Sequence, residues 1–179
     1  MAQSTTGSQP ECRPRCIVVI GVSGSGKSTV ARMLAAKLDI PYLDADDFHS
    51  PTNIQKMSAG MALTEEDRAP WLQAVGAAIS GEALCVLACS CLKRSYRVLL
   101  LSYAAGAVFV QLDVTREELV SRMNARNGHF MPASLLDSQL EIFEPLDSDE
   151  PGFKINATQN QKNLIEAIAQ QLTSLKEPN

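Results

Sequence analysis

The sequence predicts an α/β fold in which a parallel sheet of about five strands is flanked by helices. Short, uniformly apolar runs alternate with segments whose apolar residues recur at helical spacing. A glycine-rich turn joins the first such run to the first helical segment. The 179 residues, 45% of them hydrophobic, suit one domain with one core. We therefore expect a single domain over residues 16–179, preceded by a disordered polar tail over residues 1–15.

The first elements follow from composition and stop signals. The run Cys16–Ile20 is β-branched and apolar, which is typical of a strand buried on both faces of a parallel sheet. Residues 28–38 have apolar residues at helical spacing, and Pro41 prevents continuation of that helix. A short second strand is expected at Tyr42–Asp44. Ser50, followed by proline, and Thr64, followed by three acidic residues, predict two further helix starts.

In the second half of the chain, predicted strands and helices alternate again. Residues 84–89 and 107–113 are two more apolar runs and predict buried strands. Thr115 opens a capping-box pattern, which predicts a helix through about residue 126. A weak last strand at 153–155 and an amphipathic final helix complete the pattern.

The turn after the first strand matches the phosphate-binding pattern G-x-x-x-x-G-K-[ST] at every fixed position. Its glycines allow the backbone to curl so that amides point at phosphate oxygens, and the following helix adds its positive end. We expect Lys27 to reach the β and γ phosphates of ATP and Ser28 to bind Mg²⁺. A plain glycine turn is the alternative. The residues predicted to bind the nucleotide here are Gly21, Ser23, Gly24, Ser25, Gly26, Lys27, Ser28 and Thr29.

A P-loop NTPase fold does not by itself define a reaction. A regulatory GTPase would carry an Asn-Lys-x-Asp element, which the sequence lacks. A motor-type ATPase needs a carboxylate that ends a strand, and Asp113 could imitate one. A kinase needs an acceptor pocket, a carboxylate near the acceptor hydroxyl and mobile cations over the phosphates.

An acidic cluster supplies candidate carboxylates for a kinase. Asp44, Asp46 and Asp47 follow the second strand, at the edge of the sheet where open α/β folds bind ligands. If the strand continued, residues 44 and 46 would share a face. One could then hold magnesium through water while the other accepts a hydrogen bond from the attacking hydroxyl. A solvated turn that caps the next helix is the alternative.

Two arginines suggest a mobile lid over about residues 122–140. Arg122 and Arg126 are four residues apart on one helix face, and a hinge-like loop at 128–132 follows. Such arginines could fold over ATP and stabilise the transferred phosphoryl group. The alternative is a surface pair of Glu118 with Arg122 and a solvated Arg126.

Several other side chains could bind an acceptor. Lys93, Arg97 and Arg68 offer cations for a substrate carboxylate, although each could be a solvated surface charge. His49 and His129 are too isolated for a metal site, so we expect at most a phosphate or hydroxyl contact from either.

Composition restricts the remaining classes of function. The net charge of −4 argues against a nucleic-acid-binding surface, and no segment reaches the ~20 apolar residues of a membrane span. The odd count of five cysteines, without paired CxxC units, indicates reduced thiols, with Cys85 and Cys89 buried as small hydrophobes. We expect a cytoplasmic protein.

From about residue 17 to 155 the sequence resembles gluconokinases of the small P-loop type, which are related in design to shikimate and nucleoside monophosphate kinases. Beyond residues 21–29, the similarity includes Asp44-Ala45-Asp46-Asp47-Phe48-His49, Asn53, Lys56-Met57, Gly60, Leu63, Asp67-Arg68, Pro70-Trp71-Leu72, Ala88-Cys89-Ser90, Leu92-Lys93-Arg94, Tyr96-Arg97, Arg126, Gly128-His129-Phe130-Met131-Pro132, Gln139 and Glu144-Pro145. Val98 stands where an Asp is usual, and Cys91 where a small Ala is usual.

The resemblance implies transfer of phosphate from ATP to D-gluconate, a five-stranded parallel core with a lid, and a homodimer. It implies that Asp46 is the acceptor-side carboxylate and Asp44 the magnesium-side one. It assigns Arg68, Lys93 and Arg97 to the substrate, and Arg122 and Arg126 to the lid. A kinase for another sugar acid or for shikimate, or a nucleotide-binding regulator without phosphotransfer, are the alternatives.

Overall fold

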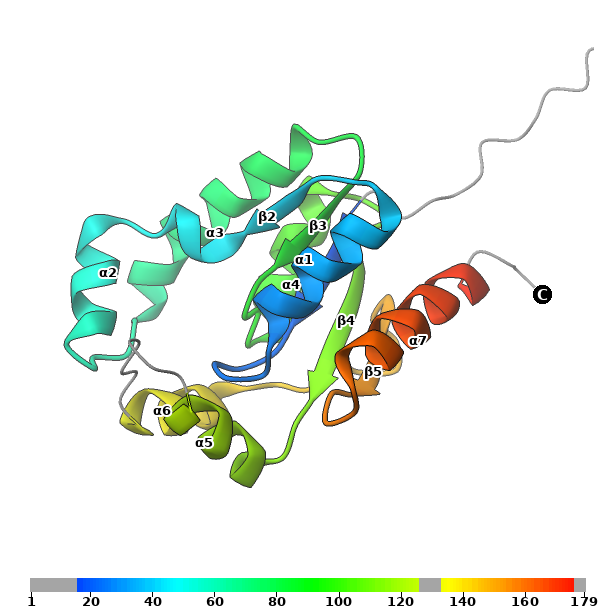
Figure 1. The fold of residues 1–179 in the computed structure, drawn as a ribbon. Helices are drawn as coiled ribbons and strands as arrows, with labels where there is room; N and C mark the ends of the chain where they lie inside the picture. The colour runs from blue at the N-terminus through cyan, green and yellow to red at the C-terminus, as the bar shows by residue number, and fades with distance from the viewer. Residues whose placement is uncertain (1–15, 126–132, 176–179) are drawn as a thin grey trace, which may run out of the picture.

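Five parallel strands form one sheet in the order β2-β3-β1-β4-β5 (Figure 1). The computed structural model describes residues 16–125 and 133–175. The predicted five-stranded parallel sheet is confirmed, and each strand lies within one or two residues of its expected position. The strands are β1 (Cys16–Ile20), β2 (Tyr42–Asp44), β3 (Cys85–Ala88), β4 (Val108–Asp113) and β5 (Gly152–Asn156).

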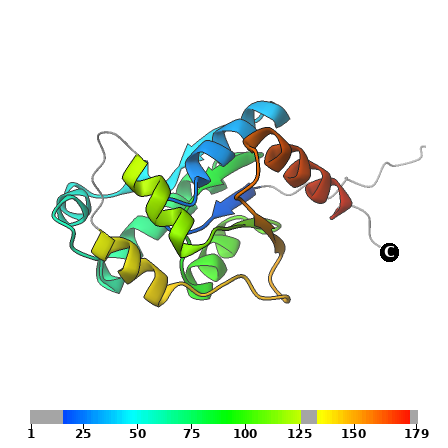
Figure 2. The same cartoon turned by 60° about the horizontal axis from the view of Figure 1, so that its bottom comes forward.

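Helices cover both faces of the sheet (Figure 2). One face carries α1 (Lys27–Leu38) and α7 (Gln161–Ser174), and the other carries α3 (Glu65–Ser80) and α4 (Arg94–Tyr103). The remaining helical elements lie toward the carboxyl ends of the strands. They are the 3₁₀ turn η1 (Ala45–Phe48), α2 (Pro51–Ser58), α5 (Arg116–Ala125) and α6 (Ala133–Ile142).

The apolar character of β1 is explained by its two packing layers. Cys16, Val18 and Ile20 belong to the core under α3 and α4, whereas Ile17 and Val19 belong to the core under α1 and α7. Because successive side chains of a strand point to opposite faces, a central strand with helices on both sides must be apolar at every position.

The helix starts predicted from capping residues are also confirmed. Ser50 Oγ accepts a hydrogen bond from the Asn53 amide at 3.1 Å, and Thr64 forms a reciprocal capping box with Asp67. Thr115 Oγ accepts from the Glu118 amide at 3.3 Å. Each side chain satisfies an amide that the first helical turn cannot satisfy itself.

The sheet order determines where a ligand can lie. The chain runs from β1 to β2 on one side of the sheet and later enters β4 on the other side. Open α/β sheets bind ligands at this point of reversal, outside the carboxyl ends of the strands. The loop that follows β1 begins there.

The four cysteines of the described residues, Cys16, Cys85, Cys89 and Cys91, are buried and free, as expected for small hydrophobes. The hydrogen bond between the thiols of Cys91 and Cys89, together with burial, raises the pKa of Cys91. Cys91 adopts a left-handed φ of 41°, just before α4. Over the described residues, no helix is long and apolar enough to cross a bilayer.

Arg97 corrects one of the expectations from the sequence. Its side chain is fully buried, and its guanidinium makes a two-pronged ion pair with Glu150 at 2.6 and 2.7 Å. Nη1 donates to the carbonyl oxygens of Cys91 and Glu144. Burial alone would raise the pKa of Glu150, but the hydrogen bonds from Arg97 and the Asp147 amide outweigh it and lower that pKa. Arg97 therefore joins α4 to the segment before β5 and is not available to a substrate.

The buried pair gives a testable effect on stability. Arg97→Ala is expected to lower the free energy of unfolding by about 3–5 kcal/mol, because it leaves the Glu150 carboxylate buried without its partner. Urea denaturation measures this change. Arg94→Ala is the matched control, since Arg94 pairs with Asp149 at the surface, and only a small loss is expected. Equal losses in the two variants would contradict a special role for the Arg97–Glu150 pair.

Candidate active site

The predicted phosphate loop lies between the end of β1 and the first turn of α1. Gly24 and Gly26 have φ values of 83° and 91°, in the left-handed region that glycine adopts without strain. Gly26 is the N-cap of α1 and no side chain caps this helix end. The first-turn amides of α1 are therefore free of side-chain acceptors, as an anion site at a helix N-terminus requires.

The loop is packed too closely for side chains at Gly21 and Gly24. A Cβ on Gly24 would lie 3.1 Å from Met123 Cγ and 3.3 Å from the Leu119 carbonyl oxygen, so α5 rests directly on the loop. A Cβ on Gly21 would lie 2.7 Å from Ser25 Oγ. That hydroxyl is buried and makes no hydrogen bond with the described residues.

Arg122 connects α5 to the phosphate loop. Nε donates to Glu118 at 2.8 Å, while Nη1 donates to the Ser25 carbonyl at 3.2 Å and Nη2 to the Ala157 carbonyl at 2.8 Å. The surface pair with Glu118 is thus present, but the guanidinium also contacts the loop. A cavity beside it is lined by Gly24, Ser25, Gly26, Thr29, Val30, Arg122, Ala125, Ala157, Gln159, Gln161 and Leu164.

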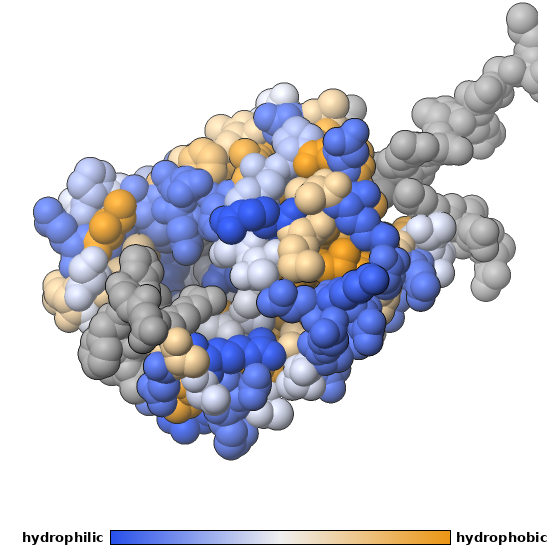
Figure 3. Space-filling model, viewed as in Figure 1, coloured by the Kyte–Doolittle hydropathy of each residue, from blue (hydrophilic) through white to orange (hydrophobic). Residues whose placement is uncertain are grey.

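A second cavity, named the acceptor-side cavity after the substrate predicted for it, lies on the other side of the loop. It brings five of the predicted site residues together: Ser23 of the loop, Lys27, Asp46, His49 and Arg68. Lys27 comes from α1, Asp46 and His49 from η1 and its end, and Arg68 from α3. The space-filling view shows the surface hollowed between α2 and α5 (Figure 3). The full lining is Ser23, Lys27, Asp46, His49, Met57, Leu63, Arg68, Trp71, Ser90, Leu92, Leu135 and Gln139.

The acidic cluster does not continue as a strand, which corrects the expected geometry. β2 ends at Asp44 and the chain turns into η1, so Asp44 and Asp46 do not share a strand face. Asp44 caps this turn, with Oδ1 accepting from the Asp46 amide at 3.2 Å and Oδ2 from the Tyr42 hydroxyl at 2.6 Å. Both Asp46 and Asp47 are exposed, but Asp46 lines the cavity and Asp47 does not. The turn therefore places the two carboxylates in different surroundings.

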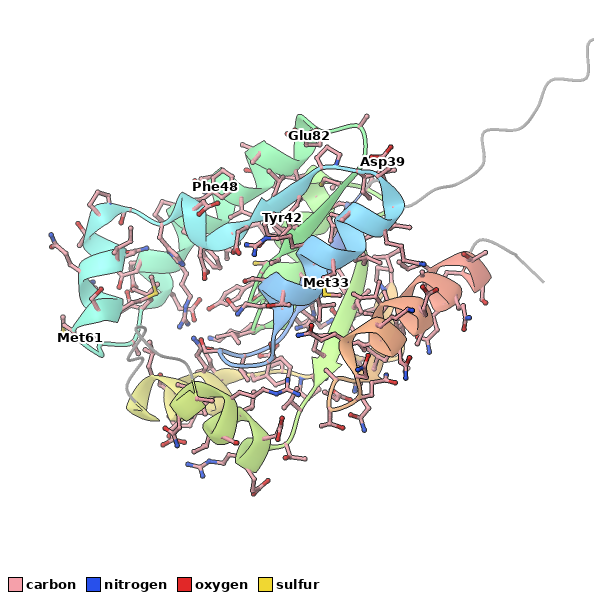
Figure 4. All side chains as sticks on the ribbon, in the orientation of Figure 1. Met33, Asp39, Tyr42, Phe48, Met61 and Glu82 are labelled. Carbon is pink, nitrogen blue, oxygen red and sulfur yellow. The ribbon has the colours of Figure 1, made fainter. Side chains whose placement is uncertain are left out.

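Two oxygen donors suited to magnesium lie near Tyr42, the first residue of β2, which lies beside α1 (Figure 4). Burial and the hydrogen bond to Asp44 raise the pKa of Tyr42 to about 12, whereas the adjacent Ser28 hydroxyl and Arg32 act in the opposite direction. The Ser28 hydroxyl and the Asp44 carboxylate thus both lie within reach of the Tyr42 hydroxyl. Mg²⁺ prefers oxygen ligands and keeps several waters, so this pair of residues fits it.

His49 is fixed inside the acceptor-side cavity by its neighbours. Its ring stacks on Trp71, with centroids 4.5 Å apart and planes 11° from parallel. Trp71 is itself buried and donates from Nε1 to the Ala45 carbonyl at 2.7 Å. Burial, assisted by the charge of Arg68, lowers the pKa of His49 against the opposing effect of Asp46. A neutral imidazole at neutral pH follows, suited to a hydroxyl rather than to a phosphate.

The predicted cations of the acceptor site have different positions. Arg68 lines the cavity, but Lys93 does not. The Lys93 ammonium instead pairs with Glu65 at 2.6 Å. Arg126 and His129 lie outside the described residues, and their assignments stay predictions.

Gln139 has a position that the residue patterns did not indicate. From α6 its Oε1 accepts a hydrogen bond from the Ser23 amide of the phosphate loop at 2.8 Å, and its side chain lines the acceptor-side cavity. A single glutamine on a helix carries no signal of function, and only the resemblance to a family marked this position. Ser90 and Leu92, which also line the cavity, were marked in the same way.

Several known proteins resemble this chain in sequence and in structure. A family model described as an AAA domain matches residues 16–146. The chain is 42% identical over 160 residues to a gluconokinase of Gluconobacter oxydans (strain 621H), covering 87% of this chain and 90% of that protein. The crystal structure of a gluconokinase from Sinorhizobium meliloti 1021 superposes with a TM-score of 0.86 at 41% identity, covering 92% and 94% of the two chains. A shikimate kinase from Acinetobacter baumannii, at 22% identity and a TM-score of 0.62, shares the fold, with 92% and 96% of the chains covered.

Proposed function

Since the chain belongs to the gluconokinase family, we propose that it transfers the γ-phosphoryl group of ATP to the 6-hydroxyl of D-gluconate and yields 6-phospho-D-gluconate. The relatives named above are the first support. The observation that carries the proposal is the acceptor-side cavity, in which Lys27 of the phosphate loop shares one space with Asp46, His49 and Arg68.

On the nucleotide side, the β and γ phosphates lie against the loop amides and the Lys27 ammonium. The base and ribose occupy the cavity beside Arg122, which opens next to Gly24, Gly26 and Thr29. This places the γ phosphate at the end of the loop that faces Asp46. The amides and Lys27 stabilise negative charge on the phosphoryl oxygens as it redistributes in the transition state.

On the acceptor side, Asp46 orients the 6-hydroxyl and accepts its proton as the oxygen attacks phosphorus. Its side chain forms no hydrogen bond with the described residues, so it is free for this task. Arg68 pairs with the gluconate carboxylate, since a guanidinium fork matches two carboxylate oxygens. The neutral His49 ring forms a hydrogen bond with a hydroxyl on the carbon chain of gluconate, between the 6-hydroxyl and the carboxylate.

Ser28 and, through water, Asp44 would hold Mg²⁺, which would neutralise charge on the phosphates. The Tyr42 hydrogen bond keeps the Asp44 carboxylate turned toward this position. Arg126 belongs to a lid over residues 122–140 that covers the phosphates, excludes water and adds positive charge at the transferred group.

The acceptor preference tests the proposal directly. With Mg·ATP, we expect ADP release with gluconate and kcat/KM at least about 10²-fold lower with glucose, because glucose leaves a cavity guanidinium without its carboxylate. Shikimate and nucleoside monophosphates in the same panel report the competing activities. A higher kcat/KM with shikimate than with gluconate would make shikimate the assigned substrate in place of gluconate. ADP release with none of the acceptors would favour a regulator without phosphotransfer.

Two further assignments accompany this function. A cytoplasmic location fits an enzyme that consumes ATP and carries free buried cysteines. A homodimer is proposed from the family resemblance alone, and light scattering of the purified protein measures it.

A further inference from the structure

The hydroxyl of Tyr96 lies behind the acceptor-side cavity, between a cation and a carboxylate. It accepts a hydrogen bond from Arg68 Nη1 at 3.3 Å and lies 2.8 Å from both carboxylate oxygens of Glu65. Tyr96 is only 5% exposed and does not line the cavity. It therefore touches Arg68 and not the space in which a substrate would lie.

The direction of these hydrogen bonds follows from the donor inventory. Arginine has only N–H donors and an ionised glutamate has only acceptors, so the phenol must donate its single proton to Glu65 and turn a lone pair to Arg68. Hydrogen bonds from Lys93 and Tyr96 hold the pKa of Glu65 below its usual value, which keeps the carboxylate ionised. Glu65 thus fixes the orientation of the Tyr96 hydroxyl.

Fixing one N–H of a guanidinium limits the rotation of the whole planar group. Among the described residues, Tyr96 is the only hydrogen-bond partner of the Arg68 side chain, and the other N–H groups of the guanidinium remain available to the cavity. An arginine that is already oriented loses less side-chain entropy when it forms a bidentate ion pair with a carboxylate. The buried phenol, held in place by the packing of α4, supplies this orientation.

We infer that Tyr96, oriented by Glu65, is a positioning residue that sets the Arg68 guanidinium for the carboxylate of the acceptor and thereby favours sugar acids over neutral sugars. The inference rests on the proposed function and assigns the discrimination to two residues that do not touch the substrate. It also gives the Lys93–Glu65 pair a role, since Lys93 keeps Glu65 in place at 2.6 Å.

Tyr96→Phe removes only the hydroxyl oxygen. We expect KM for gluconate to rise about tenfold, the scale for one hydrogen bond to a charged group, while kcat and KM for ATP change by less than about twofold. With D-glucitol, a polyol that has CH₂OH in place of the carboxylate, kcat/KM should stay as in the wild type. A purely structural role for the hydroxyl would lower the melting temperature without this split between acid and polyol.

Tyr103→Phe is the matched control. Tyr103 lies on the same helix, and its hydroxyl makes no hydrogen bond within the described residues, so its KM for gluconate should match the wild type. Glu65→Ala tests the chain of contacts. If Glu65 acts through Tyr96, the two substitutions should not add. The gluconate KM of the Glu65→Ala/Tyr96→Phe double variant should then be no higher than that of the single variant with the higher KM.

The outcomes separate this inference from the function on which it rests. A wild-type enzyme that phosphorylates gluconate, with an unchanged gluconate KM in Tyr96→Phe, overturns the inference and leaves the function standing. Equal losses with gluconate and glucitol also overturn it. A wild-type protein that does not turn over gluconate overturns both.

Discussion

Lys27→Ala is expected to lower kcat by about 10³-fold, with the fold intact. Loss of a single preorganised charge-stabilising donor has this scale, and Lys27 is the cation that joins the phosphate loop to the acceptor-side cavity. Its side chain is half-buried at the start of α1 and makes no ion pair with the described residues, so its removal breaks no internal contact of that kind. Steady-state kinetics and a thermal melt measure the two quantities.

The control for Lys27 lies on the same helix. Lys37→Ala removes a surface pair with Glu166 at 2.7 Å, far along α1 from the loop, and should leave kcat within about twofold. Near-normal turnover of a folded Lys27→Ala variant would show that the loop does not bind the transferred phosphate.

Asp46→Asn is expected to lower kcat by roughly 10²-fold or more while both substrates still bind, which is the scale for losing a positioned general base. Asparagine keeps the size and the hydrogen-bonding capacity but removes the negative charge. Saturating gluconate and excess Mg²⁺ should not restore the rate, because the proposed metal-side carboxylate is Asp44. Initial rates over a matrix of both concentrations measure this.

Asp47→Asn is the matched control for Asp46. Asp47 is its exposed neighbour in the same turn and does not line the cavity, so its kcat should remain close to the wild-type value. Recovery of Asp46→Asn by raised Mg²⁺ would move Asp46 to the metal side. An unchanged kcat in Asp46→Asn would show that Asp46 has no part in the reaction and only belongs to the turn.

Two positions depart from the family pattern, and the structure shows where each of them lies. Val98, which stands where an acidic residue is usual, is 56% exposed on α4 and does not line the acceptor-side cavity. Cys91 is buried, and its carbonyl oxygen accepts from Arg97 at 3.2 Å. Any side chain small enough for the core meets this requirement, because the contact uses the backbone.

The sequence by itself determined the elements whose cause is local. The apolar runs predict the strands, Ser50, Thr64 and Thr115 predict helix starts, and the glycine pattern predicts the phosphate loop. Each of these rests on residues a few positions apart, so the physical rule can be read from the chain. The alternation of strands and helices extended this to the parallel sheet, because parallel strands need crossover connections.

Only the tertiary structure decided what the charged side chains do. Arg97 and Lys93 both looked like substrate contacts, but Glu150, 53 positions from Arg97, and Glu65, 28 positions from Lys93, take their hydrogen bonds. Gln139 meets the phosphate loop across 116 positions. The role of a long charged or polar side chain depends on which hydrogen-bond or ion-pair partner the fold brings within about 3 Å of its end group. The spacing of residues along the chain does not determine that distance.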